Sequence, residues 1–334
     1  MASAFGTVFL PKMAITWFDG HSWSQPEMVS SDSLTLHPGA HVLHYSSTCF
    51  EGLKAFRHAD GSVNIFRMDK NVNRLIQSSR LLHLPELSPE QISGMITQTV
   101  AHFAQEVPSP PGSLYIRPTH IGTEAAIGKA ATPSATSCFY VLVSPVGDYF
   151  AGGDRALRLL LEEDGMRCAA HMGMIKSGGN YASALNPILK ANAEVQADQV
   201  LFCPNGDVQE TGAANFLLID GNEIITKALD STFLHGVTRD SILTLAKDLG
   251  MQVTERDLSV TELLERAAKP GCEAALSGTA AVLTPVGTLI YQGQEYSVGQ
   301  GKLGTETRVV KLRQALNAIQ WGTAADTHGW LTRI

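Results

Sequence analysis

The chain has 334 residues, which is long for one hydrophobic core and sufficient for two domains. Hydrophobic residues make up 44% and charged residues 17%, and no apolar run reaches the roughly 18 residues that a membrane-spanning helix needs. The net charge of −7 comes without a basic stripe for a phosphodiester backbone. We therefore expect a soluble protein that binds neither nucleic acid nor membrane.

Cysteine and histidine spacing gives no sign of a metal centre. The five cysteines are widely spaced and contain no C-x-x-C pair, so neither a disulfide framework nor a zinc knuckle is indicated. The histidines include no H-E-x-x-H, and His41 and His44 lie in a strand-like stretch. The first residues lack a basic start and are broken by Gly6 and Pro11, which is atypical of a secretory signal and predicts a cytoplasmic protein.

The first half of the chain begins with short alternating runs. Between Ala14 and Phe66, Asp-Gly turns at Asp19-Gly20 and Asp60-Gly61 separate runs such as ITWFDG, HVLHYSS and SVNIF. Alternating apolar residues between such turns are typical of antiparallel hairpins. This pattern predicts strands throughout the segment, the HVLHYSS run included.

Two helices and two long strands follow. The spacing over Met68–Leu82 predicts a helix, and its apolar face carries Val72, Leu75, Ile76 and Ser79. Ser88-Pro89-Glu90-Gln91 has a capping residue, a proline at the first helical position and an acidic first turn, and predicts a second helix to about Gln105. The runs SLYIRPTHIG and SCFYVLVSP then read as strands.

A cluster of Pro, Gly and Asp over Pro145–Asp154 indicates a domain boundary. We therefore divide the chain into a small domain over 1–145, a loop over 146–154 and a larger domain over 155–334. The second domain has strand-like runs near Leu157–Glu162, Gln199–Cys203, Ala214–Ile219 and Glu223–Thr226. The predicted class is α/β (α+β), with helices beside mixed or antiparallel sheets.

Two further helices are predicted in the second domain. The first runs from Arg239 to Leu249, ends at Gly250 and buries Ile242, Leu245 and Leu249. The second spans roughly Thr305–Gln320. No repeat or low-complexity segment interrupts this organisation.

Nucleotide-binding fingerprints are absent: there is no G-x-G-x-x-G, and Gly122–Lys129 misses the phosphate-loop spacing. What remains is a set of separated segments: LHYSSTCFEGLKAFR, NRL, LYIRP, IKSGGNY, QETGAANF, LHGVTRDS and SGTAAVLTPVG. Together, in this order and at these spacings, they resemble the branched-chain amino-acid aminotransferases, which are fold-type IV enzymes dependent on pyridoxal 5'-phosphate. The resemblance runs from about Trp17 to the C-terminal HGWL.

The resemblance assigns Lys176, in IKSGGNY, as the lysine that bonds covalently to the cofactor. On its own, a lysine in a Gly-rich turn would read as an exposed loop residue. An amine here binds the cofactor aldehyde and, once displaced by substrate, moves the Cα proton. By the same resemblance, Tyr181 binds the phenolic oxygen of the cofactor. Glu210 matches the carboxylate that faces the pyridine nitrogen and keeps it protonated.

The cofactor phosphate is expected at a helix N-terminus. Gly236 leads into the helix near Arg239, so the N–H groups of Val237 and Thr238 should point at an anion. The resemblance adds Arg74, as a guanidinium clamp on the same phosphate. It also adds the hydroxyl of Thr279.

For the substrate, the resemblance assigns two sets of residues. Tyr45 and Phe50 would form aromatic walls for an aliphatic side chain, and Tyr115 and Arg117 would project from one strand face. Without the resemblance these aromatic residues would read as core. The backbone amides of Thr279 and Ala280 would receive the substrate carboxylate.

The chain also departs from the family pattern. His235 stands where the family usually has Pro, and Ala213 replaces a common hydroxyl residue. Lys129 lies in a loop that often offers an apolar residue to the partner subunit's pocket. Asn186-Pro187 is expected to interrupt the helix after Tyr181. Finally, Ala281 and Thr284 occupy the positions of the redox C-x-x-C of some mammalian members, so that thiol switch is absent.

The implied enzyme has its cofactor between the domains and forms a homodimer. It would transfer the amino group of leucine, isoleucine or valine to 2-oxoglutarate. A D-amino-acid aminotransferase or an aminodeoxychorismate lyase on the same fold, and a non-catalytic binding protein, are the alternatives. The Tyr115–Arg117 pair, Tyr45 and the long C-terminal extension favour the branched-chain enzyme.

Overall fold

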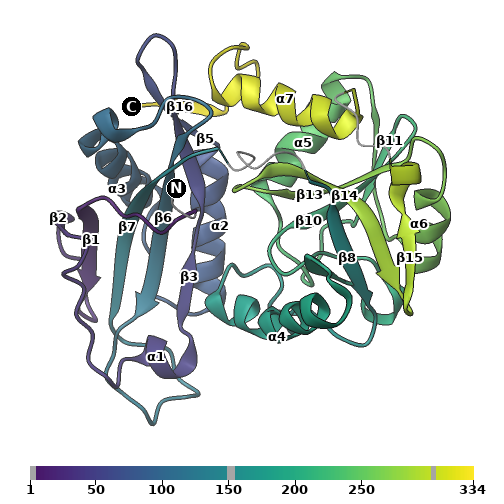
Figure 1. The fold of residues 1–334 in the computed structure, drawn as a ribbon. Coiled ribbons are helices and arrows are strands. Elements are labelled where there is room, and N and C mark those ends of the chain that lie inside the picture. Colours follow the sequence, from purple (N-terminus) through teal and green to yellow (C-terminus); the bar gives the residue numbers. More distant parts are fainter. Residues whose placement is uncertain (1–4, 149–154, 302–305) are drawn as a thin grey trace. The chain divides into compact units, whose positions relative to one another are not determined.

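Two sheets, each in a unit of its own, organise the chain in a computed structural model that describes residues 5–148, 155–301 and 306–334 (Figure 1). Unit 1 comprises Met1–Ala151, Ile175–Gly178 and Ala318–Ile334, and unit 2 comprises Gly152–Met174 and Gly179–Asn317. The predicted mixture of helix and sheet is confirmed. Most of the predicted boundary loop, residues 149–154, lies outside the described residues.

The sheet of unit 1 is antiparallel, with the order β16-β5-β4-β6-β7-β1-β2, and β3 pairs with β6. Its strands are β1 (Lys12–Phe18), β2 (Glu27–Ser30), β3 (Thr48–Phe50), β4 (Leu53–Arg57), β5 (Val63–Phe66), β6 (Ser113–Gly122), β7 (Ser137–Val146) and β16 (Leu331–Arg333). The Asp60-Gly61 turn joins β4 to β5, as predicted, and Gly61 there has a φ of +84°. The C-terminal β16 adds to β5, a pairing that the sequence-based division does not foresee.

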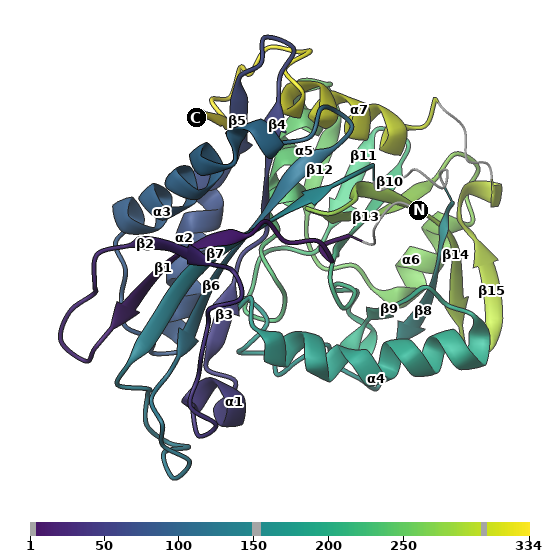
Figure 2. The ribbon, with the colours of Figure 1, turned by 60° about the vertical axis from the view of Figure 1, so that its left-hand side comes forward.

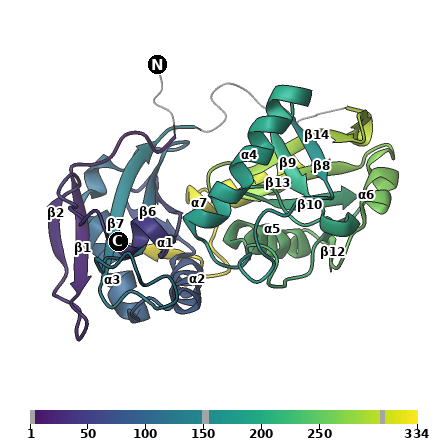
Figure 3. The same cartoon turned by 90° about the horizontal axis from the view of Figure 1, so that it is seen from below.

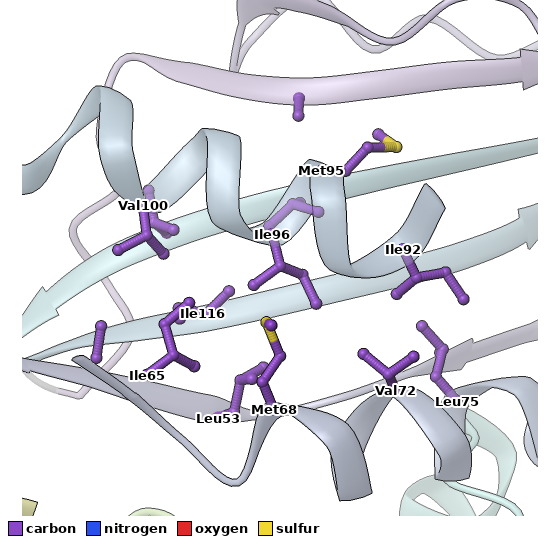
Figure 4. Close-up of a cluster of buried hydrophobic side chains, with 14 of the residues drawn as sticks. Leu53, Ile65, Met68, Val72, Leu75, Ile92, Met95, Ile96, Val100 and Ile116 are labelled. Atoms are coloured by element: carbon purple, nitrogen blue, oxygen red, sulfur yellow. The ribbon is translucent and has the colours of Figure 1, made fainter. Parts of the chain in front are cut away.

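Two helices cover one face of this sheet, α2 (Met68–Leu81) and α3 (Pro89–His102), as Figure 2 shows. Both were predicted. α3 begins at the expected cap, where the Ser88 hydroxyl accepts from the Gln91 N–H as part of a capping box. The core between helices and sheet is built from aliphatic side chains (Figure 4), among them Leu53, Ile65, Val72, Leu75, Ile92, Ile96 and Ile116.

The strand predicted for HVLHYSS is wrong, because His41–Tyr45 forms the short helix α1. The alternating pattern covers too few residues to decide between the two periods, and tertiary contacts decide instead. The buried His41 ring contacts the Ser47 hydroxyl at 2.9 Å and the carbonyls of Lys129 and Thr132. Ser46, with a φ of +51°, ends the helix.

Unit 2 contains a mixed sheet with the order β12-β11-β10-β13-β14-β8-β9, and β15 pairs with β14. Its strands are β8 (Leu157–Glu162), β9 (Gln199–Phe202), β10 (Asn215–Asp220), β11 (Glu223–Thr226), β12 (Gln252–Glu255), β13 (Glu273–Gly278), β14 (Val282–Tyr291) and β15 (Gln294–Ser297). The pairs β8·β9, β8·β14 and β11·β12 are parallel. The predicted strands are therefore present, within a residue or two at their ends.

Helices lie on both faces of this sheet (Figure 3). They are α4 (Gly178–Val195), α5 (Val237–Asp248), α6 (Val260–Ala267) and α7 (Arg308–Gln320). Along β9, Val200 and Phe202 pack with α4, whereas Leu201 between them packs with α6. No helix of the described residues is long and apolar enough to cross a membrane.

Two expectations for these helices are wrong. α4 continues through Pro187 despite the lost N–H and the crowding of the preceding turn, and Ala184 and Ala191, on either side of the proline in sequence, pack in the core beneath the helix. In α5, Ile242 and Leu245 are buried as predicted, but Leu249 is 56% exposed. The helix ends at Asp248, so Leu249 falls outside its apolar stripe just before Gly250, whose φ is +75°.

A buried polar chain crosses the core of unit 1. His120 Nδ1 contacts the Ser79 hydroxyl at 2.9 Å, and its Nε2 contacts the Ser137 hydroxyl at 2.6 Å. His120 is 1% exposed, and this burial lowers its pKa to about 3. In the unfolded chain, this histidine takes up a proton as the pH falls below about 6.5. In the folded protein, the ring is still neutral at that pH.

We expect this histidine to make the protein less stable in mild acid. Between the two pKa values the unfolded state binds the extra proton, so stability is complete above about pH 6.5 and is lost as the pH falls towards 3. At pH 5 the loss should be about 2 kcal/mol. Urea unfolding at pH 7 and pH 5 measures it, with His120→Gln as the control that lacks the titrating ring. An equal pH dependence in both proteins would contradict this assignment.

Candidate active site

Lys176 belongs to unit 1, although the chain on both sides of Ile175–Gly178 belongs to unit 2. Its N–H donates to the Ser78 hydroxyl of α2 at 3.2 Å, and its carbonyl accepts from the Phe50 N–H at 3.0 Å. Its Nζ lies 5.2 Å from the centre of the Phe50 ring. The backbone of this lysine is thus fixed from two sides, and its amine is directed to an aromatic face.

Beside Lys176, a buried carboxylate that the sequence analysis missed holds Arg74. Glu51 is 1% exposed, and its two oxygens accept from Arg74 Nε at 2.6 Å and Nη2 at 2.8 Å. Asn71 donates to the same carboxylate at 2.7 Å. Burial raises the pKa of Glu51, but the charges of Arg74 and Lys176 and the hydrogen bonds from Arg74 and Asn71 outweigh it and lower that pKa. Glu51 is therefore ionised.

Arg74 was predicted to clamp a phosphate. Its fork is oriented by Glu51, which fixes the plane of the guanidinium. The phosphate role of Arg74 remains a prediction.

Three of the predicted substrate residues line one cavity in unit 1, of about 320 Å³. Arg117 lies with its guanidinium carbon 4.5 Å from the centre of the Phe50 ring and 5.3 Å from that of Tyr115. Its Nη2 donates to the Tyr115 hydroxyl at 2.8 Å, while its buried Nε has no hydrogen-bond partner among the described residues. The remaining lining, which the sequence analysis missed, comes from Phe5, Gly6, Phe9, Thr119, Tyr140, Leu142, Val143 and Ser144.

Gly52 makes room for the Tyr115 side chain. A Cβ atom at this position would lie 2.1 Å from the Tyr115 hydroxyl oxygen, a distance that no side chain tolerates. Gly52, in the FEG segment, therefore allows the position of the Tyr115 hydroxyl. That hydroxyl in turn accepts a hydrogen bond from Arg117.

Tyr45, predicted as a second aromatic wall, does not line this cavity. It lies at the end of α1, where its hydroxyl donates to the Ile127 carbonyl and its ring contacts that of His41. Leu43 and Ile127 beside it are 59% and 68% exposed. The structure thus brings Phe50, Tyr115 and Arg117 together and leaves Tyr45 at the tip of unit 1, where its substrate role remains a prediction.

In unit 2, Glu210 is held by a buried arginine that the sequence analysis also missed. Arg167 Nη1 lies 2.8 Å from Glu210 Oε1, and both side chains are at most 3% exposed. Asn215 Nδ2 and the Leu234 N–H donate to the same carboxylate. The Arg167 guanidinium also lies 5.6 Å from the centre of the Tyr181 ring, so Tyr181 and Glu210 share one neighbour.

The N-terminus of α5 has the features of an anion site. Its cap, Gly236, has no side chain to accept the first N–H groups, and a Cβ there would lie 2.0 Å from Asn215 Oδ1. The amides of Val237 and Thr238 occupy the first turn, where a helix has no internal acceptors for them. His235, the departure before this glycine, turns its Nε2 to the Asp230 carbonyl at 2.7 Å.

Thr279 and Ala280 lie in the turn between β13 and β14 and are half-buried. Val282, which ends this turn, has a φ of +62°, a conformation that is strained for a β-branched residue. The five cysteines are all buried free thiols, and none lies in this turn.

We expect the loss of one partner of the buried Arg167–Glu210 ion pair to lower the free energy of unfolding strongly. Arg167→Met leaves an uncompensated buried carboxylate and should destabilise the protein by about 3 kcal/mol, whereas Arg167→Met with Glu210→Gln should cost less than the sum of the single changes. Thermal unfolding measures both. Arg80→Met, in a pair that is 61% and 62% exposed, is the matched control and should cost much less, because solvent screens an exposed pair. Equal costs for Arg167→Met and Arg80→Met would contradict this expectation.

Comparison with known proteins identifies the family to which the chain belongs. The family model for amino-transferase class IV matches residues 48–289. A probable branched-chain-amino-acid aminotransferase of Streptomyces coelicolor is 40% identical over 98% of this chain and 91% of its own length. Branched-chain-amino-acid aminotransferase 2 of Bacillus subtilis is 36% identical over 99% and 92%.

Solved structures agree with the sequence relatives. A T.th. branched-chain amino acid aminotransferase, solved with pyridoxamine 5'-phosphate, matches with a TM-score of 0.79 and 26% identity, over 96% of this chain and 97% of that one. The Escherichia coli enzyme of the same name matches with a TM-score of 0.74 and 26% identity, over 96% and 98%. The residues, the fold and these relatives together place the chain in the class IV aminotransferases, among the branched-chain amino-acid aminotransferases.

Proposed function

We propose that the protein uses pyridoxal 5'-phosphate to transfer the amino group of branched-chain L-amino acids to 2-oxoglutarate, with L-glutamate and branched-chain 2-oxo acids as products. The observation that carries this proposal is the cavity next to Lys176, whose walls are aromatic and aliphatic and which contains one guanidinium, that of Arg117. Such a cavity suits an apolar side chain and still offers one partner for a second carboxylate.

The chain has a donor set that fits this cofactor. Lys176 offers an amine whose backbone is fixed, and the first turn of α5 offers Val237 and Thr238 amides beneath a glycine cap. Glu210 offers a carboxylate whose charge is kept by Arg167 and Asn215. We assign Lys176 to the aldehyde, Val237, Thr238, Arg74 and Thr279 to the phosphate, Glu210 to the ring nitrogen and Tyr181 to the phenolic oxygen.

Bound pyridoxal phosphate supplies an aldehyde that takes up the amino group and a ring that accepts the electrons of the broken Cα–H bond. Lys176, whose amine is released when substrate takes its place, would remove the Cα proton and pass it to the former aldehyde carbon of the cofactor, and water would then release the 2-oxo acid. The ion pair with Arg167 favours the charged form of Glu210, which would hold a proton on the ring nitrogen of the cofactor. The amides of Thr279 and Ala280 receive the substrate carboxylate and so orient the Cα–H bond.

One cavity has to accept leucine and glutamate in turn. The aliphatic side chain of leucine contacts the Phe50 and Tyr115 rings, which require no charge partner. The distal carboxylate of glutamate would be excluded from an apolar cavity, but Arg117 meets it there. The hydrogen bond from Arg117 to Tyr115 keeps the guanidinium in place when the cavity holds leucine.

We also propose that the protein is a homodimer in the cytoplasm. Tyr45 lies beside the exposed Leu43 and Ile127, and such apolar residues at a loop tip suit a partner subunit. In this loop, Ile127 can offer the apolar side chain for the partner subunit's pocket. Lys129 does not, because it is paired with Glu124. Buried free thiols fit a reducing compartment. Sedimentation analysis of the wild type and of Ile127→Asp tests the dimer, and cell fractionation tests the location.

A donor panel against 2-oxoglutarate tests the reaction. Leucine, isoleucine and valine should react, and their D-enantiomers and 4-amino-4-deoxychorismate should not. The purified protein should be yellow, and leucine should bleach or shift the band. A preparation that stays colourless with added pyridoxal phosphate would end the proposal, and turnover of the D-enantiomers would replace it by the D-amino-acid aminotransferase.

Lys176→Ala should leave a folded protein that holds pyridoxal phosphate without a covalent bond, because the phosphate contacts are elsewhere in the chain. Turnover should fall by several orders of magnitude, since both covalent capture and the proton shuttle are lost. Mass spectrometry after borohydride reduction should find the cofactor on the wild type and not on the variant. Lys190→Ala, at an exposed lysine on α4, is the control. Near-normal turnover of Lys176→Ala would refute its assignment.

Arg117→Met should slow the half-reaction with 2-oxoglutarate by ~1.5–3 kcal/mol, the scale of one charge-assisted hydrogen bond. The half-reaction with leucine should change much less, because leucine has no distal carboxylate. Single-turnover measurements separate the two. Equal losses would mean that Arg117 is structural or binds the α-carboxylate, and the absence of any loss would place it outside the substrate path.

A further inference from the structure

Three rows of paired residues form the cavity floor where β6 pairs with β7. The register places Thr119 opposite Tyr140, Arg117 opposite Leu142 and Tyr115 opposite Ser144. All of these residues line the cavity, and they point to the same face because they are two residues apart on each strand. Successive rows are roughly 7 Å apart along the strands.

The rows lie at increasing distance from Lys176. Phe50 is opposite Thr119 in the first row, its N–H donates to the Lys176 carbonyl, and its ring lies under the Lys176 amine. Arg117 lies in the second row. The third row, farthest along the strands, continues onto β4, because Lys54 is opposite Tyr115 there. We name Lys54, Tyr115 and Ser144 the outer row.

The outer row contains polar groups for which the proposed reaction has no use. Ser144 is 2% exposed, and its hydroxyl lines the cavity without a hydrogen-bond partner among the described residues. The Lys54 ammonium lies 5.8 Å from the centre of the Phe5 ring, and Phe5 itself packs edge-on against Tyr115. Leaving a hydroxyl unsatisfied in a cavity costs free energy unless a ligand group meets it.

The ammonium is also unusually easy to discharge. Desolvation lowers the pKa of Lys54 to about 8, and the charge of Asp148 opposes that shift. Arg117 is a cation of the cavity lining, one row closer to Lys176, and Lys54 borders that lining at Phe5 and Tyr115. An anion held between Lys54 and Arg117 would relieve the desolvation of both cations, and no branched-chain side chain can do so.

We infer that the outer row is a second carboxylate-binding position, which lets the enzyme use 2-amino and 2-oxo acids with an ω-carboxylate on a longer chain than that of glutamate. The inference rests on the proposed function, since Lys176 is its fixed end. The Lys54 ammonium and the Ser144 hydroxyl donate to this carboxylate, while Arg117 receives the shorter 2-oxoglutarate. 2-Oxoadipate, with one more methylene, and 2-oxopimelate, with two more, cover only part of the roughly 7 Å between rows, and the long side chain of Lys54 supplies the remaining reach.

The test is the half-reaction of the aminated holoenzyme with 2-oxoglutarate, 2-oxoadipate, 2-oxopimelate and 4-methyl-2-oxopentanoate at pH 7. We expect kcat/KM for 2-oxoadipate to be within about tenfold of that for 2-oxoglutarate. Lys54→Met should lower the ratio of 2-oxoadipate to 4-methyl-2-oxopentanoate by about 10- to 100-fold, and Ser144→Ala should lower it by about 3- to 10-fold. Lys70→Met, at an exposed lysine on α2, is the matched control and should leave the ratio as it is.

The charge of Lys54 provides a second readout, the pH dependence of this ratio, which a purely structural role of Lys54 would not change. Only the protonated amine binds the ω-carboxylate, so the wild-type ratio should fall as the pH rises through about 8, whereas Lys54→Arg should keep its ratio to pH 9. Asp148, Arg117 and Tyr115 are the other groups that face this position.

The outcomes are separable from those of the proposed function. If leucine and 2-oxoglutarate exchange amino groups but 2-oxoadipate reacts more than about a thousandfold more slowly, the outer row does not bind a carboxylate and the inference is wrong. Equal losses on all four oxo acids in Lys54→Met would also overturn it, because Lys54 would then only shape the cavity. Absence of any exchange with leucine would instead refute the proposed function.

Discussion

A carboxylate inside a protein stays charged only if a cation stays beside it, and each unit of this chain is built around one such pair. Glu51 with Arg74 in unit 1 and Glu210 with Arg167 in unit 2 are almost fully buried. Removing either arginine would leave a charge that the low dielectric penalises by several kcal/mol. The pairs fix two planar groups in orientation, and an enzyme that handles an amine, a phosphate and a ring nitrogen needs that rigidity.

The cavity that we propose for the substrate holds its charged group in a different way. Its guanidinium lies between two aromatic rings and donates to a phenol, so it is partnered even when no carboxylate is present. In the proposed function, Arg117 can therefore face an apolar side chain without being an unpaired charge, and a dicarboxylate would replace weak contacts by a strong one. Gly52 supports this arrangement because it leaves room for the Tyr115 phenol.

Local patterns in the sequence predicted the elements whose signals are local. The capping box at Ser88, the stripe of α2 and the long strands β6 and β7 depend on residues within one or two turns or on one strand. The errors arise where distant contacts decide: His41 is bound by carbonyls near residue 130, and α4 is held through Pro187 by the sheet. Arg167 and Glu51 were missed for the same reason, since nothing adjacent to them in sequence indicates their partners. The resemblance supplied the family's residues and could not supply these supporting ones.

Unit 1 is assembled from three separate stretches of chain, and this has a consequence for the order of its folding. β16 lies among the last residues, pairs with β5 and places Trp330 on Phe66 and Arg67. During synthesis, β5 therefore remains an unpaired edge until the whole of unit 2 has left the ribosome. A nascent chain of this enzyme exposes a strand edge for the time that the 265 residues after Phe66, up to Leu331, take to emerge, at roughly 5–20 residues per second. The strand β16, which follows Trp330, thus adds the last edge strand to the sheet that the first residues of the chain begin.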